Sequence, residues 1–134
     1  MTNPFELTAT DAIKLICDHK LSRYEWIQSC FERIREKEDL VKAWIYLDED
    51  RALEKARQLD NKNNESQLGI PFGIKDIIDA SNTPTGFGTN FYQNNVPMRD
   101  AASVAVAKQS GCIFIGKTVS TELGHRAPGL TTNP

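Results

Sequence analysis

The chain has 134 residues, about the size of one domain at roughly 150 residues per domain. Hydrophobic residues make up 40% of it and charged residues 25%, a composition typical of a folded domain with a modest core. The formal net charge of −2 argues against a nucleic-acid or anionic-membrane surface, since both need clustered positive charge.

Amphipathic helices account for the beginning of the chain. Thr8 and Asp11 have the spacing of a capping box, which predicts a first helix that ends near Lys20. Ser22 and Glu25 repeat this spacing and open a second helix that runs through residue 37. Apolar side chains at helical spacing form one stripe on this helix: Tyr24, Ile27, Phe31 and Ile34.

A strand and a third helix follow. Residues 41–47 predict an extended segment with four apolar side chains on one side: Val41, Ala43, Ile45 and Leu47. Asp48 is placed to cap a helix whose apolar side is formed by Ala52, Leu53, Ala56 and Leu59. The polar residues 60–67 predict a loop.

The sequence changes in character at Leu68. All eight glycines and five of the six prolines lie beyond it. Residues 69–76 predict a strand that enters a loop, and residues 112–115 predict a buried strand. Asp100 is expected to cap a short helix that stops at Gly111, and residues 118–124 are expected to start another helix.

This order of elements predicts an α/β fold: N-terminal helices, then the first strands and helices of a mixed, mostly parallel sheet. We divide the chain into a helical leader, residues 1–67, and the start of an α/β core, residues 68–134. Too few strands are present to complete such a sheet. We therefore expect residues 1–134 to be the truncated N-terminal part of a single domain.

The sequence shows no targeting segment. No apolar run approaches the roughly 18 residues of a membrane span, and residues 1–6 lack the basic and apolar regions of a secretory signal. Cys17, Cys30 and Cys112 fit no zinc or redox spacing. We expect a cytoplasmic protein with reduced thiols, without a metal and without a cofactor.

Residues 111–118 match the phosphate-loop pattern G-x-x-x-x-G-K-[ST]. That loop must follow a strand and curl around phosphates, whereas here a predicted helix precedes it. The four inner residues, 112–115, are strand formers that would run extended through a core. The sequence therefore argues against nucleotide binding, and Lys117 is interpreted as a structural residue at a strand end.

Lys75 has two interpretations. Beside an apolar strand, a lysine is usually a surface residue whose ammonium group reaches water. Two features favour a chemical role: Gly69 and Gly73 permit close approach of other backbone, and strand alternation directs Lys75 and Asp76 to opposite faces. A desolvated lysine without a carboxylate partner can act as a base.

Several motifs together resemble the opening of the amidase signature family. They are Gly69-x-Pro71-x-x-x-Lys75-Asp76, Thr85-Gly86-Phe87-Gly88-Thr89, Asp100-Ala101, Gly111, Gly116-Lys117-Thr118, Glu122 and Asn133-Pro134. The helical half agrees more loosely, through Glu32-Arg33-Ile34, Ala43-Trp44 and Ala52-x-x-x-Ala56. The departures are mild: Ser81-Asn82 stands where the family usually has a glycine, and Ser110-Gly111-Cys112 replaces Ala-Gly-Ala.

The resemblance implies an amide hydrolase with a Ser–cis-Ser–Lys triad on an α/β core. Lys75 matches the lysine of the family and would be the general base of an acyl-enzyme mechanism. Both serines of the family lie in a Gly/Ser-rich stretch beyond the Asn-Pro at residues 133–134. We therefore expect this chain to supply one member of the triad and to be inactive alone.

Two alternatives stay open. The first, within the family, is the glutamine-hydrolysing component of a tRNA-dependent amidotransferase. The second is a non-catalytic interaction module on residues 8–59, which should leave the apolar stripe of the second helix exposed. The expected partners are a small amide substrate and either a second copy or amidotransferase subunits, with no direct nucleic-acid contact and no membrane.

Overall fold

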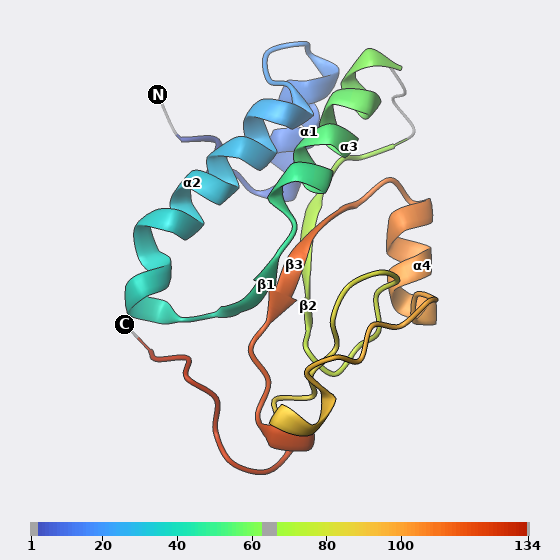
Figure 1. The fold of residues 1–134 in the computed structure, drawn as a ribbon. Coiled ribbons are helices and arrows are strands. Elements are labelled where there is room, and N and C mark those ends of the chain that lie inside the picture. The colour runs from blue at the N-terminus through green and yellow to red at the C-terminus, as the bar shows by residue number, and fades with distance from the viewer. Residues whose placement is uncertain (1–2, 63–66, 134) are drawn as a thin grey trace.

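A computed structural model describes residues 3–62 and 67–133. Its four α-helices are α1 (Ala9–Cys17), α2 (Arg23–Val41), α3 (Glu49–Asn61) and α4 (Ala102–Gln109). Three strands, β1 (Trp44–Leu47), β2 (Pro71–Lys75) and β3 (Ile113–Thr118), lie at the centre of the molecule (Figure 1). None of the helices in the described ranges is long and apolar enough to cross a membrane.

The three strands form one mixed sheet with the order β1-β3-β2. The middle strand, β3, pairs parallel with β2 and antiparallel with β1. A crossover that contains α4 joins the two parallel strands, as parallel pairing requires. The prediction of an α/β fold with a mixed sheet is confirmed.

The helix starts follow the predicted caps. The Thr8 hydroxyl accepts a hydrogen bond from the Asp11 N–H at 3.1 Å. Ser22 and Glu25 form the reciprocal pair of a capping box, because the Ser22 N–H also donates to the Glu25 carboxylate at 2.8 Å. The first helix ends at Cys17, earlier than predicted, and the second continues to Val41, beyond the predicted end.

The predicted extended segment at residues 41–47 is shorter in the structure, and the apolar side that it was given is not the buried one. Because α2 extends to Val41, the strand begins only at Trp44. Trp44 and Tyr46 are half-buried, whereas Ile45 and Leu47 are 60% and 36% exposed. Side chains alternate along a strand, so the packing of the Trp44 ring against the sheet decides the face for its neighbours.

Two predicted helix caps are also wrong. The Asp100 carboxylate accepts hydrogen bonds from the Ser81 N–H at 2.7 Å and from Lys108 Nζ at 2.8 Å, and Ala101 occupies the N-cap position of α4. Asp48 stands at the N-cap of α3 but pairs with Arg51 at 2.8 Å instead of capping the helix. Both carboxylates thus have cations as partners, and Asp100 also has a loop N–H, in place of the helix N–H groups.

The predicted last helix is absent from the described residues 118–124. The strand β3 runs through Thr118, and a single turn of 3-10 helix follows at Glu122–Gly124. Leu123 and Gly124 have positive φ values of 49° and 81°, which an α-helix does not permit. The predicted loop at residues 60–67 lies partly outside the described residues.

The apolar stripe of α2 is packed against the sheet. Ile27 and Phe31 belong to a buried cluster with α3 and β3, and Tyr24 and Ile34 pack at its border. The cluster consists of Ile27, Phe31, Ala52, Ala56, Leu59, Ile113 and Ile115. The stripe is therefore not free to bind a partner, and the alternative of a helical interaction module loses the exposed face that it needs.

The phosphate-loop pattern folds as the sequence predicts. Gly111 ends the turn after α4 with a φ of 80°, and Ile113 and Ile115 are buried within β3. Extended backbone in the core cannot curl around a phosphate.

A second buried cluster, beside α4, contains Ile74, Ala80 and Val104, with Phe72 and Phe114 packed against them.

Candidate active site

Lys75 is the last residue of β2, at the carboxyl end of the parallel strand pair. It is exposed, and its side chain makes no hydrogen bond or ion pair with residues 3–62 or 67–133. Its backbone is well held, since its carbonyl oxygen accepts the Ile78 N–H at 3.0 Å. The carboxyl ends of parallel strands are where α/β sheets usually bind their ligands.

The next residue, Asp76, points the opposite way and is buried, at 4% exposure. Its carboxylate accepts the Gly86 N–H at 3.0 Å and the Gly88 N–H at 3.4 Å. Its own N–H donates to the Thr118 carbonyl at 3.0 Å, which extends the pairing of β2 with β3 by one residue. The prediction that Lys75 and Asp76 point to opposite faces is consistent with this burial.

Lys117 supplies the positive charge that Asp76 needs in the core. It is fully buried, and its Nζ lies 3.9 Å from Asp76 Oδ1, the distance of an ion pair but not of a hydrogen bond. The same ammonium group donates a hydrogen bond to the Thr85 hydroxyl, which is also fully buried. Lys117 is thus structural, as predicted, but it lies inside the core and next to the candidate base.

A β-bulge brings Lys117 to this side of the sheet. The register of β2 on β3 shifts between Phe72 and Gly73, so that Gly73 pairs with Gly116 and Ile74 with Lys117. Without the shift, plain alternation would place Lys117 on the same face as Ile113 and Ile115. A one-residue shift moves every later side chain to the opposite face.

Burial sets the electrostatics of the buried pair. Loss of water lowers the pKa of Lys117 below the ordinary value for lysine, and the carboxylates of Asp76 and Asp79 partly offset this effect. Asp79 has one buried carboxylate oxygen without a hydrogen-bond partner among the described residues. Both carboxylates come from the segment that follows β2.

The glycines near Lys75 make room for side chains, not for backbone as predicted. A Cβ atom on Gly73 would lie 2.6 Å from the Trp44 ring, and one on Gly69 would lie 2.6 Å from Arg23 Cδ. Gly73 and Lys75 share one face of β2 by alternation. The Trp44 ring therefore packs over the face from which Lys75 projects.

Two hollows lie near these elements, and Lys75 lines neither. A groove of about 560 Å³ runs past Asp76, Gly86 and Gly88 on one side and Val119 and Ser120 on the other. Its lining is mainly apolar, with the charge of Asp76 turned away toward Lys117.

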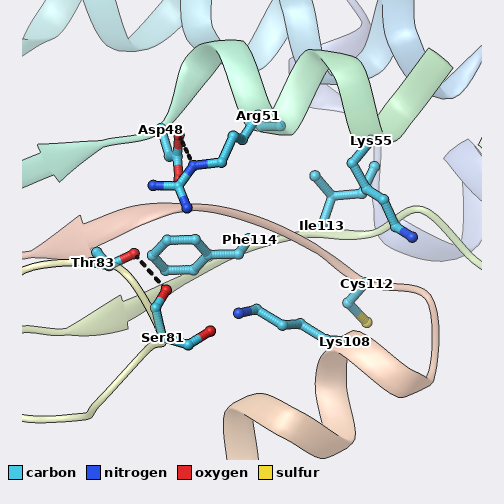
Figure 2. A pocket seen from close by; sticks show the side chains of 10 residues that line it. Asp48, Arg51, Lys55, Ser81, Thr83, Lys108, Cys112, Ile113 and Phe114 are labelled. Atoms are coloured by element: carbon cyan, nitrogen blue, oxygen red, sulfur yellow. Dashed lines mark hydrogen bonds and ion pairs between the residues drawn. The ribbon is translucent and has the colours of Figure 1, made fainter. Parts of the chain in front are cut away.

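The other hollow has a volume of about 240 Å³. Figure 2 shows Arg51 and Lys108 on either side of the Phe114 ring and Lys55 beside Ile113. Two of these cations already have carboxylate partners, since Arg51 pairs with Asp48 and Lys108 with Asp100. No cluster of three or more His, Cys, Asp or Glu side chains suited to a metal occurs within the described part of the chain. His19 and His125 are exposed.

Sequence reasoning does not find the buried triplet of Asp76, Thr85 and Lys117. Strand alternation identifies Asp76 only as a residue that would not pair with Lys75. Lys117 is noticed only because residues 111–118 match the phosphate-loop pattern. One signal is available: Lys117 directly follows an uncharged, largely apolar run at residues 111–116, so it enters the sheet with that run. Gly73 and Gly116, which lie at the bulge, are a weak local sign of it.

This α/β topology, with a lysine at the end of a parallel strand, agrees with the resemblance to the amidase signature family. A family model described as Amidase matches residues 25–132. The chain belongs to the amidase family.

Relatives in sequence include two bacterial proteins that are components of glutamyl-tRNA(Gln) amidotransferases by name. The one from Fusobacterium nucleatum is 33% identical over 135 residues, which cover 97% of this chain and 27% of the relative. The one from Endomicrobium trichonymphae is 33% identical over 113 residues, which cover 81% of this chain and 23% of the relative.

Solved structures of amidases share the fold. The peptide amidase from Stenotrophomonas maltophilia matches 90% of this chain with a TM-score of 0.80 and 26% identity. A fatty acid amide hydrolase matches the whole chain with a TM-score of 0.86, and at 21% identity it shows the fold alone. The chain covers 26% of each of these two structures, so it spans about a quarter of the length of its relatives.

Proposed function

We propose that this chain is the lysine-bearing part of an amide hydrolase and that Lys75 is its general base. The observation that carries the proposal is the division of roles between two neighbouring lysines. Lys117 pairs with the buried Asp76, and Lys75, beside that carboxylate in sequence, has no partner among the described residues. An ion pair with a carboxylate favours the protonated form of a lysine, and Lys75 has no such pair among the described residues.

In the proposed reaction, two serines from outside this chain complete the site. Neutral Lys75 accepts a proton from the hydroxyl of a bridging serine, which takes a proton from the nucleophilic serine. The serine oxygen bonds to the amide carbon, and the amine leaves with a proton returned by the same route. Water then cleaves the acyl-enzyme ester. Because both serines lie outside, the 134-residue chain alone is proposed to be inactive.

Two substrate classes are compatible with this role. A small amide is the general proposal, with the protein working in the cytoplasm. The names of the curated relatives favour a more specific one, in which the chain is part of a glutamine-hydrolysing component that works with other amidotransferase subunits. Residues that would distinguish these substrates are expected in the remaining three quarters of such a protein.

The test is a fusion in which this chain replaces the matching segment of the Stenotrophomonas maltophilia peptide amidase. The fusion, Lys75→Ala and Lys75→Arg are compared on a simple aryl or aliphatic amide. Arginine keeps the charge but stays protonated, so both variants should lose at least about 100-fold in kcat. Substantial hydrolysis by the arginine variant would refute the role of Lys75, and a folded but inactive parent fusion would count against the amidase function.

A further inference from the structure

We propose that Asp76 and Lys117 are positioning residues: their buried ion pair holds Asp76 in the core and so directs Lys75 to the opposite face of β2, where its side chain is exposed. This inference rests on the proposed function of Lys75, since a positioning role has meaning only beside a reacting group. It adds two residues to the site, neither of which touches the reacting atoms.

The first argument is how completely Asp76 is held. Its N–H donates to the Thr118 carbonyl, and its carbonyl accepts the Phe87 N–H at 2.9 Å. Its two carboxylate oxygens accept the N–H groups of Gly86 and Gly88, and Lys117 faces one of those oxygens. Every polar group of Asp76 therefore has a partner, and the residue cannot rotate without breaking several interactions.

The second argument is that the same interactions fix the loop beside Lys75. Thr85 accepts a hydrogen bond from Lys117, and its N–H donates to the Asn95 carbonyl at 2.9 Å. The Asn95 amide returns a hydrogen bond to the Thr85 carbonyl at 3.1 Å. Residues 85–88 are thereby tied both to the strand ends and to residue 95, and the N–H groups of Gly86 and Gly88 hold the Asp76 carboxylate.

The third argument concerns charge. Two lysines lie near Asp76: Lys75 precedes it in the sequence, and Lys117 Nζ lies 3.9 Å from its carboxylate. In the core, its carboxylate pairs with Lys117, so it does not hold Lys75 in an ion pair. An ion pair with a carboxylate favours the protonated form of a lysine and so opposes its use as a base. Because Lys117 pairs with the Asp76 carboxylate, that carboxylate does not form an ion pair with Lys75.

The test compares three substitutions in the fusion described above: Lys117→Met, Asp76→Asn and Thr85→Val. The first two should lower kcat by about 10- to 100-fold with KM within about 3-fold, because misdirection of a base affects turnover more than substrate binding. Thr85→Val removes only the hydroxyl that Lys117 contacts and should give a smaller loss of kcat. If Lys117→Met fails to fold, Thr85→Val tests the positioning role of Lys117 in its place.

Lys108→Met is the matched control. It breaks a partly buried ion pair of a different site, with Lys108 Nζ 2.8 Å from Asp100 Oδ1, and should leave kcat within about 2-fold. In the 134-residue chain, Asp76→Asn should speed hydrogen exchange at the Gly86 and Gly88 amides by at least about 10-fold, and Lys108→Met should not.

Failure of this inference differs from failure of the proposed function. If Lys75→Arg abolishes turnover but Lys117→Met and Asp76→Asn keep the parent kcat, the positioning role is wrong. If Lys75→Arg keeps its activity, the proposed function itself is wrong. A drop in kcat as large in Lys108→Met as in Lys117→Met would mean that general loss of stability, not positioning, explains the effect.

Discussion

Removal of the Asp76 carboxylate should destabilise the chain far more than removal of the whole buried pair. In Asp76→Asn, Lys117 stays fully buried with a charge that its former partner no longer balances. In the double variant Asp76→Asn with Lys117→Met, both charges are gone and the side-chain volumes are nearly kept. The single variant should therefore be less stable than the double variant, although it carries fewer changes.

The size of the effect follows from the burial of Lys117. Breaking a buried pair by removing one partner costs about 3–5 kcal/mol. The lysine can limit this cost by losing its proton, which at pH 7 takes about 4–5 kcal/mol from an ordinary pKa near 10.4. The double variant loses mainly the hydrogen bonds of the glycine amides, about 1–2 kcal/mol. The expected gap between the two variants is about 2–3 kcal/mol.

The pH dependence gives the sharper assay. Burial lowers the pKa of Lys117, so between its folded and unfolded pKa values the unfolded chain binds more protons. The contribution of Lys117 to the free energy of unfolding therefore rises as the pH approaches the unfolded pKa near 10.4. This rise should be steeper in Asp76→Asn than in the unsubstituted chain, because the carboxylate that offsets burial is gone. Urea unfolding of both variants from pH 7 to pH 10 should show the gap closing. Equal stabilities at pH 7, or a gap independent of pH, would refute the account of Lys117 as an uncompensated buried charge.

Two other substitutions test the packing. Gly116→Ala should lower the free energy of unfolding, measured in urea, by about 2–3 kcal/mol. The added Cβ would run into the Tyr46 carbonyl oxygen and crowd Leu47 and Trp44. Wild-type stability would show that the β1–β3 contact is looser than described. Burial raises the pKa of Cys30 to about 11, so at pH 8 a disulfide reagent should modify the exposed Cys17 about 100-fold faster than Cys30. Since the unfolded thiol ionises near 9.0, stability should fall between pH 9 and pH 11, and Cys30→Ala should remove that part of the loss.

Local chemistry explains which features could be predicted from sequence. The helix starts at Thr8 and Ser22 depend on hydrogen bonds between residues three positions apart, so the sequence alone determines them. The apolar run at residues 112–115 could only be buried, and a strand is what such a run forms when it is short. Lys75 at the end of its strand, and Asp76 on the opposite face, follow from alternation over two residues.

Tertiary contacts decided the rest. The inward face of β1 depends on where α2 ends and on the space that Gly73 and Gly116 leave for the Trp44 ring, and those glycines lie on other strands. Asp100 had two kinds of possible partner, the N–H groups at the start of α4 and the groups that the fold brings near it, and it binds Lys108 and the Ser81 N–H. The ion pair of Asp76 with Lys117 joins residues far apart in the sequence and exists only because a bulge turns Lys117 to that face. A register shift is set by the packing of whole strands; Gly73 and Gly116 mark where a bulge can form, but they do not fix which residues pair beyond it.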